Sequence, residues 1–170
     1  MRSARLYAAH ALITLLPPSR GFAIKRALLR WCGARIGEDV RIASSARFLL
    51  TGPLSIGEGT WLGQDFLVAG GDAEVRIGAR VDIGPRVTLV TGSHAIQRNA
   101  DRAAGPGYSV PITIEDGAWI GASATVLGGV TLGRCCIVAA GALVKDDVPA
   151  GAIVAGVPAR ALRPAEVPAT

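Results

Sequence analysis

His94 is the residue of this chain that is best suited to proton transfer near neutral pH. The chain has only two histidines, His10 and His94. His94 ends the segment Thr-Gly-Ser-His at positions 91–94 and opens a polar, glycine-rich run that continues to Tyr108. An imidazole titrates near neutral pH, so it can take a proton from an alcohol. A lone histidine in a loop is by default an ordinary solvated residue, so its role depends on the elements that position it.

The three cysteines give no sign of metal binding or nucleophilic chemistry. Cys32, Cys135 and Cys136 are an odd number without the spacing of a metal site, and adjacent cysteines rarely pair with each other. Cys135 and Cys136 have no activating neighbours in the sequence, so we expect no covalent enzyme intermediate. We expect all three to be small buried hydrophobic residues in a reducing cytoplasm.

Composition and charge limit the class of protein. The chain is 50% hydrophobic and 18% charged, which excludes disorder, and its 170 residues suffice for one domain. The 22 glycines and 5% aromatic residues indicate many tight turns around a narrow core. The net charge is +5, but the basic residues are spread out and lack interleaved aromatic side chains, so nucleic acid is not expected. An anionic small ligand or an anionic membrane surface accounts for the charge at least as well.

A six-residue repeat dominates the chain and decides the fold. In the C-terminal half, aliphatic residues recur every six positions: Ile114, Ile120, Val126, Leu132, Val138 and Val144. Small residues follow four positions after the first five: Ala118, Ala124, Val130, Cys136 and Ala142. The same phase appears upstream in groups of three: Ile36, Ile42 and Phe48; Ile56, Leu62 and Val68; Ile77, Ile83 and Leu89. Neither a helix, with a period of about 3.6, nor a simple strand has this period.

A period of six fits a short strand followed by a turn, with one large aliphatic side chain pointing inward in each unit. Three units would close a triangular coil, and about five coils would stack as parallel strands roughly 4.8 Å apart. Glycine directly follows several of the aliphatic residues, as at Gly57 and Gly121. We expect these glycines to adopt dihedral angles that other residues avoid. The predicted fold class is therefore all-β, a parallel β-helix.

Departures from the repeat divide the chain into three parts. Residues 1–34 are predicted to form a short helical cap over one end of the β-helix, broken at Pro17-Pro18. Residues 35–145 are predicted to form the β-helix, with an inserted loop at about 91–110. A long loop in a regular solenoid usually serves binding. Residues 146–170 are predicted to form a C-terminal tail packed along the coils.

The N-terminal segment bears on where the protein resides. Its apolar run from Leu6 to Leu16 is too short to span a bilayer, and the following Pro-Pro-Ser-Arg is a poor signal-peptide cleavage site. We expect a cytoplasmic protein, with peripheral contact to the inner face of the membrane as the alternative. In that alternative, Lys25, Arg26 and Arg30 would face lipid head groups.

The pattern aliphatic-Gly-x-x-small-x resembles the hexapeptide-repeat acyltransferases, whose fold is a left-handed β-helix. His94 followed by Trp119-Ile120-Gly121 is similar to the sugar and xenobiotic branch, which places a catalytic histidine at the start of such a loop. The resemblance implies that His94 is the general base and that its Nε2 removes the acceptor proton during direct transfer. It also implies that Trp119 lies beside the pantetheine arm of the donor, near His94.

The C-terminal sequence from Ala139 to Pro149, followed by Gly-Val-Pro-Ala-Arg at 156–160, is similar to the C-terminal signature of the sugar and xenobiotic branch. This similarity implies acetyl-coenzyme A as the donor, with backbone contacts at Ala122 and Ala140. It also implies that Arg160 contacts a phosphate, for which a planar guanidinium is well shaped.

Two departures from the family pattern concern the phosphates and the acceptor. The family usually has Thr-Lys-Asp after its last valine, whereas this chain has Lys145-Asp146-Asp147, so Lys145 reaches the phosphates from a different angle or not at all. The sugar branch often has an asparagine one coil before the histidine loop. Gly63 stands at that place here, with Gln64 and Asp65 beside it as the candidates for acceptor binding.

The resemblance implies an O-acetyltransferase acting on a sugar hydroxyl of a bacterial surface polysaccharide, a lipid-linked glycan or a sugar nucleotide. The N-terminal segment resembles polysaccharide-modifying members in particular. N-acetylation of an amino sugar or small amine, and a non-catalytic binding scaffold, stay open as alternatives. Members of the family are homotrimers with donor sites between subunits. Metalloenzymes of this fold hold zinc with three histidines, so we expect no metal in a chain with two.

Overall fold

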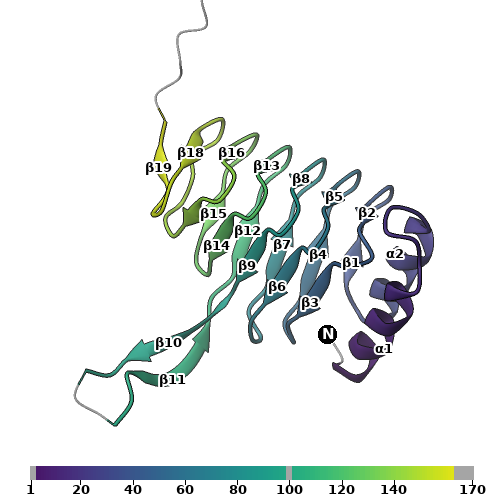
Figure 1. Ribbon diagram of the computed structural model, residues 1–170, viewed down its shortest axis with the longest axis horizontal. Coiled ribbons are helices and arrows are strands. Elements are labelled where there is room, and N and C mark those ends of the chain that lie inside the picture. Colours follow the sequence, from purple (N-terminus) through teal and green to yellow (C-terminus); the bar gives the residue numbers. More distant parts are fainter. Residues whose placement is uncertain (1–2, 99–100, 163–170) are drawn as a thin grey trace, which may run out of the picture.

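The computed structural model describes residues 3–98 and 101–162, which form a triangular prism of stacked coils with two helices over one end (Figure 1). Three sheets form its sides. Sheet A contains β1 (Arg35–Ile36), β4 (Leu54–Ile56), β7 (Val75–Ile77), β12 (Ile112–Ile114) and β15 (Thr131–Leu132). Sheet B contains β2 (Arg41–Ile42), β5 (Trp61–Leu62), β8 (Asp82–Ile83), β13 (Trp119–Ile120), β16 (Ile137–Val138), β18 (Ile153–Ala155) and β19 (Arg160–Ala161). Sheet C contains β3 (Arg47–Leu49), β6 (Leu67–Ala69), β9 (Thr88–Val90), β14 (Thr125–Leu127) and β17 (Leu143–Val144).

Five complete coils run from β1 to β17, as the repeat predicts. In each coil the chain passes from sheet A to sheet B to sheet C and then continues into the next coil. Equivalent residues pair across coils, for example Ile56 with Ile77 and Trp119 with Ile137. The prediction of an all-β, left-handed parallel β-helix is confirmed.

The core is a column of aliphatic side chains with small residues at the corners. The aliphatic residues of the last two coils are each at most 1% exposed: Ile114, Ile120, Val126, Leu132, Val138 and Val144. Cys136 and Cys32 are buried as expected, and burial raises the pKa of the Cys136 thiol to about 11, so it stays protonated near neutral pH. The expectation of burial is wrong for Cys135, which is exposed at a corner.

The glycines that follow the aliphatic residues serve close packing between coils rather than an unusual dihedral angle. A Cβ at Gly121 would lie 2.5 Å from the backbone nitrogen of Ala140 in the next coil. The positive φ instead falls two residues later, at Ser123 (61°) and Cys135 (54°). The predicted dihedral role of these glycines is therefore wrong, because the corner needs the missing side chain more than the freedom of φ.

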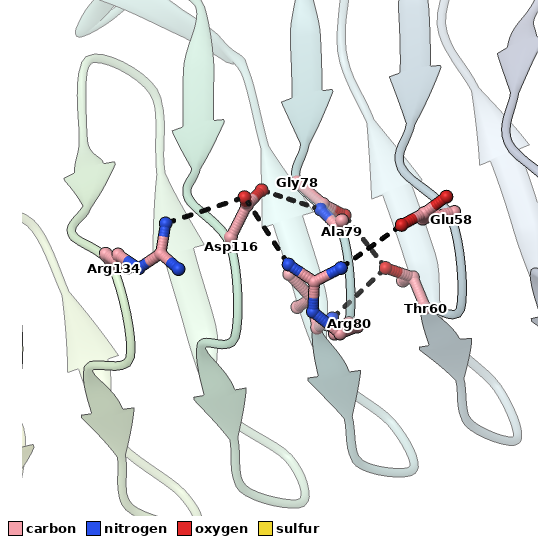
Figure 2. Close-up of polar contacts among 8 residues, drawn as sticks. Glu58, Thr60, Gly78, Ala79, Arg80, Asp116 and Arg134 are labelled. Atoms are coloured by element: carbon pink, nitrogen blue, oxygen red, sulfur yellow. Dashed lines mark hydrogen bonds and ion pairs between the residues drawn. The ribbon is translucent and has the colours of Figure 1, made fainter.

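A ladder of charged side chains follows the corner between sheets A and B (Figure 2). Arg80 lies 3.2 Å from Glu58 and 3.9 Å from Asp116, and Asp116 lies 3.8 Å from Arg134. Asp116 also accepts a hydrogen bond of 2.8 Å from the backbone N–H of Ala79. Exposed ion pairs contribute little individually, so the stability of the stacked coils rests mainly on the buried core.

The helical cap, α1 (Ser3–Thr14) and α2 (Phe22–Trp31), covers the open edge of the first coil (Figure 1). Backbone groups on that edge have no neighbouring strand to bond. The cap supplies one partner to each edge strand: Lys25 Nζ donates to Ile42 O at 2.9 Å, Arg30 Nε donates to Ile36 O at 2.9 Å, and His10 Nε2 accepts from the Phe48 N–H at 3.2 Å. The cap therefore satisfies an edge that would otherwise invite pairing with another chain.

Three cations of α2, Lys25, Arg26 and Arg30, point toward the first coil. Lys25 is fully buried, which lowers the pKa of its ammonium group. Arg26 donates to the carbonyl of Val40 at 3.2 Å. The alternative in which Lys25 faces lipid head groups is therefore wrong, and Arg26 and Arg30 are held by backbone carbonyls. Within residues 3–98 and 101–162, no helix has both the length and the apolar character needed to cross a bilayer.

Acidification is expected to loosen the cap through His10. Burial, together with the nearby Arg47 cation, lowers the pKa of His10 below its ordinary value of 6.5. The unfolded chain therefore protonates this residue at a higher pH than the folded one, so the free energy of unfolding falls as the pH drops from about 6.5 through the folded pKa. Urea unfolding at a series of pH values measures this slope. The slope should flatten in His10→Gln, whose side-chain oxygen accepts from Phe48 without titrating; an unchanged slope would assign it to other groups.

After β17 the chain first continues the prism. Val148 bridges to Leu132, and β18 pairs in parallel with β16, so the segment predicted as a tail begins with a partial sixth coil. β19 then pairs antiparallel with β18 at the end of the prism. The last part of the predicted tail, residues 163–170, lies outside the described residues, as do residues 99–100 of the inserted loop.

Candidate active site

The inserted segment is an antiparallel hairpin, β10 (Gly92–Ile96) and β11 (Ala104–Ser109), that projects from the prism (Figure 1). It leaves the prism where the chain passes from β9 of sheet C to β12 of sheet A. Its register sets His94 opposite Gly107, with an irregularity between His94 and Ile96. His94 is thus an exposed residue on a defined strand rather than in an irregular loop.

The backbone of the opposite strand orients the His94 ring. His94 Nδ1 lies 2.8 Å from the carbonyl oxygen of Gly105. A carbonyl only accepts, so we assign the proton of the neutral ring to Nδ1, which leaves Nε2 as the acceptor. Nε2 is the nitrogen that a general base needs to present to its substrate.

His94 lines a shallow depression between the hairpin and the neighbouring corner of the prism. Its lining is polar and rich in glycine: Gly70, Gly71, Asp72, Gly92, Ser93, His94, Gly107, Tyr108 and Ser109. A Cβ at Gly71 would lie 3.0 Å from the Ser109 hydroxyl oxygen, so the absence of a side chain keeps this part open. The depression gives an incoming polar group room to approach His94.

The same depression holds a carboxylate, Asp72. The Ser109 hydroxyl donates to Asp72 Oδ1 at 2.6 Å and accepts from the backbone N–H of Ala73 at 3.2 Å. The bond from Ser109 lowers the pKa of Asp72, which is therefore ionised near neutral pH and able to accept hydrogen bonds from a ligand. Sequence reasoning missed Asp72 and Ser109. The available signal was the stretched spacing between Val68 and Ile77, which contains Asp72.

The two cations predicted to contact phosphate lie together near the end of the prism. Lys145 Nζ donates to both carboxylate oxygens of Asp146, at 2.9 and 2.8 Å. Arg160 Nη1 lies 3.7 Å from the same carboxylate, and both cations line one depression. The hydrogen bond from Lys145 lowers the pKa of Asp146, and the charges of Lys145 and Arg160 act in the same direction. Both side chains are largely exposed, so an anionic ligand can reach them.

Trp119 does not lie beside His94 within one chain. It stands on sheet B, 57% exposed, and pairs with Asp82 of the preceding coil and Ile137 of the following one. The hairpin that carries His94 leaves the prism between sheets C and A, and Trp119 does not line the His94 depression.

Four further predicted residues share the corner between sheets B and C: Gln64, Asp65, Ala122 and Ala140. Ala122 and Ala140 occupy successive coils, where the Gly141 N–H donates to the Ala122 carbonyl at 2.8 Å. Gln64 and Asp65 are exposed, but they do not line the His94 depression. Within one chain, the predicted donor and acceptor residues therefore do not meet at the predicted base.

Comparison with known proteins adds to this geometry. The family model "Bacterial transferase hexapeptide (six repeats)" matches residues 111–146. The galactoside O-acetyltransferase of Escherichia coli K12 is 32% identical over 139 residues, which cover 82% of this chain and 68% of that protein. A 2,3,4,5-tetrahydropyridine-2,6-dicarboxylate N-acetyltransferase of Staphylococcus aureus is 53% identical over 60 residues, 35% of this chain and 25% of that protein. The chain spans about half or less of several other relatives.

A solved structure is similar over almost the whole chain. It is a hexapeptide-repeat-containing acetyltransferase of Vibrio cholerae O1 biovar eltor, complexed with acetyl-coenzyme A, with a TM-score of 0.62 and 26% identity. The match covers 94% of this chain and 85% of that chain. Together with the repeat and the coils that it builds, these matches establish the family. The chain belongs to the hexapeptide-repeat transferases and is an acyltransferase.

Proposed function

We propose that this chain transfers the acetyl group of acetyl-coenzyme A to a hydroxyl group of a sugar, with His94 as the general base. The hydrogen bond from His94 Nδ1 to the Gly105 carbonyl carries the proposal, because it leaves Nε2 of the neutral ring unprotonated, and His94 lines the same depression as the Asp72 carboxylate. The E. coli relative, a galactoside O-acetyltransferase, supports the acceptor class. The acetyl-coenzyme A complex of the V. cholerae protein supports the donor.

The proposed reaction is a direct transfer. His94 Nε2 takes the proton of the acceptor hydroxyl while the hydroxyl oxygen bonds to the thioester carbonyl carbon. The resulting tetrahedral intermediate breaks its carbon–sulfur bond, and the coenzyme A thiolate takes the proton back from His94. The products are an acetyl ester and the free thiol of coenzyme A. The Gly105 carbonyl keeps its bond to Nδ1–H throughout and stabilises the imidazolium cation that forms in between.

Asp72 is proposed to bind a second hydroxyl of the acceptor. Its carboxylate is ionised and accepts one bond from Ser109, which leaves further lone pairs for a ligand. A carboxylate in the same depression as the base suits a polyol such as a sugar, because one hydroxyl can be held while its neighbour reacts. Gln64 and Asp65, the residues expected from the sequence, stay proposals for acceptor contact from a neighbouring subunit.

The proposed assembly is a homotrimer with the donor between subunits. In one chain, Trp119, Ala122, Ala140 and the pair Lys145 and Arg160 lie away from His94. A hairpin that projects from the prism is able to reach the sheet of a second copy. Such an arrangement would bring the phosphate-binding cations of one subunit and the base of another to one donor molecule.

The proposed function is tested by the release of coenzyme A thiol. The protein is incubated with acetyl-coenzyme A and a panel of soluble galactosides, glucosides and amino sugars, and acetylated products are identified by mass spectrometry and NMR. O-acetylation of a glycoside supports the proposal. N-acetylation alone would support the alternative, which the S. aureus N-acetyltransferase relative favours.

A cytoplasmic site of action fits the exposed free thiol of Cys135, since such thiols persist in reducing compartments.

Arg160→Ala is expected to weaken acetyl-coenzyme A binding about tenfold or more, because a hydrogen bond to a charged group contributes about 1.5–3 kcal/mol. Thermal unfolding at a series of donor concentrations measures the change, since a ligand that binds only the folded protein raises its stability. Arg76→Ala is the matched control, because Arg76 is similarly exposed and forms an ion pair of 3.2 Å with Glu74 on sheet A. Equal donor affinity in the two variants would remove Arg160 from the donor site.

A further inference from the structure

Helix α1 is apolar on both of its faces. Its inner face packs into the core through three residues that are at most 6% exposed: Leu6, Ala9 and Ile13. Its outer face carries Tyr7 and Leu12, which are 81% and 50% exposed, and Leu15 directly after the helix is 82% exposed. The inner face accounts for the packing of the cap, so the outer face needs another explanation.

Exposed large hydrophobic side chains gather in the helical cap. Of the 12 that the described residues contain, five lie between Tyr7 and Trp31. Two of these five are aromatic, and Arg5 stacks on the Trp31 ring at 5.2 Å from its centre. Aromatic and arginine side chains with an apolar body and a polar tip suit the boundary between lipid and water.

The charge of the cap is uniformly positive. The first 37 residues contain seven basic residues and no acidic residue, and Glu38 is the first carboxylate of the chain. Lys25 and Arg26 bond to neutral backbone carbonyls, so their charges are not cancelled. Arg30 has an acidic partner in Glu38, whereas Arg20 is exposed in the segment that joins α1 to α2, and no ion pair of Arg20 occurs within the described part of the chain.

We propose that the outer face of α1, together with Leu15 and Arg20, binds the surface of an anionic phospholipid bilayer. An apolar helix face with exposed tyrosine and leucine side chains can lie in the plane of the interface, where the anionic surface attracts nearby basic residues. A second copy is a poorer occupant, because a symmetric contact would bring two positive caps together.

The position of this face relates the bilayer to the active site. An apolar groove runs beside α1, and its lining reaches from Leu6 and Tyr7 to Gly70. Gly70 also lines the His94 depression, so the groove beside α1 adjoins the depression that holds the proposed base. A glycan acceptor carried on a lipid would reach His94 from this side.

The test is sedimentation of the full chain with phospholipid vesicles. Wild type is expected to bind vesicles that contain about one quarter phosphatidylglycerol, to release as salt is raised, and not to bind pure phosphatidylcholine. Leu12→Ser/Leu15→Ser and, separately, Arg20→Glu are each expected to weaken binding about tenfold or more. Leu162→Ser is the matched control, because Leu162 is 51% exposed at the other end of the prism. Circular dichroism confirms that each variant keeps its helices.

Three results would overturn the inference: no binding of wild type to anionic vesicles, equal binding by the leucine double variant, or a changed molar mass of that variant in light scattering. The last result would make the outer face of α1 a subunit contact. Acetyl transfer to a soluble glycoside should be unaffected by the leucine double variant, so this test is independent of the proposed chemistry.

Discussion

His94→Asn is expected to lower kcat by about 10²–10⁴-fold, the range that general base catalysis commonly contributes. Asparagine is similar in size, and its amide can still donate to the Gly105 carbonyl, but it has no nitrogen that takes a proton near neutral pH. Thiol release at saturating acetyl-coenzyme A and acceptor measures kcat. Donor affinity from thermal unfolding should stay near that of wild type, because Lys145 and Arg160 are untouched.

His10→Gln is the control for this prediction, because it removes the other histidine, which serves the cap. It should keep the kcat of wild type at neutral pH. If His94→Asn retained a tenth or more of the wild-type kcat, another group would be removing the proton, and His94 would be reduced to binding the acceptor. Loss of donor binding in His94→Asn would instead indicate a disturbed hairpin.

The β-helix could be predicted because aliphatic residues recur every six positions along the chain. Most inward positions hold an aliphatic side chain and many corner positions a small one, as at Ile120 and Ala124. The reason for the glycines was predicted wrongly, since the approach of Ala140 to Gly121 depends on the neighbouring coil and not on local conformation. A contact between coils has no local signature in the sequence.

The site was predicted less completely, because its partners are distant or belong to the backbone. His94 was predicted from its residue type together with the family pattern, but its hydrogen-bond partner is the carbonyl of Gly105, which any residue could supply. Asp72 and His94 line one depression because the base of the hairpin packs there, where Ser109 bonds to Asp72 across 37 positions of sequence. Lys145 and Arg160 meet through Asp146, which the displaced lysine did not reveal.

For the cap, too, the residue types could be predicted from the sequence, but the orientation of the side chains could not. The sequence indicates a basic, helical N-terminal segment, but α1 is apolar on both faces and so does not reveal which face packs inward. In the membrane-contact alternative, Lys25 was expected to face lipid head groups. Lys25 is buried because its ammonium group bonds the Ile42 carbonyl, which has no neighbouring strand on that edge. This contact has no local signature in the sequence.

Lys25→Met is expected to lower the free energy of unfolding by about 2–4 kcal/mol, because a buried acceptor left without its partner costs about 1–3 kcal/mol and bonds from a cation are lost as well. Methionine fills a similar volume, so the loss reports the ammonium group rather than a cavity. The carbonyls of Pro17 and Pro18 keep bonds from Ser44, whereas Lys25 is the bonded partner of Ile42 O. Urea unfolding followed by tryptophan fluorescence measures the change.

Arg20→Met is the matched control for Lys25→Met, since it removes an exposed cation from the same segment and should change stability by less than about 0.5 kcal/mol. Equal stability of the two variants would mean that the desolvation of the ammonium group offsets its three hydrogen bonds. In that case the edge of the first coil would be protected by the apolar contacts of α1 and α2 alone. A large difference would instead show that a buried cation closes the open end of this β-helix by bonding the carbonyl that no strand can reach.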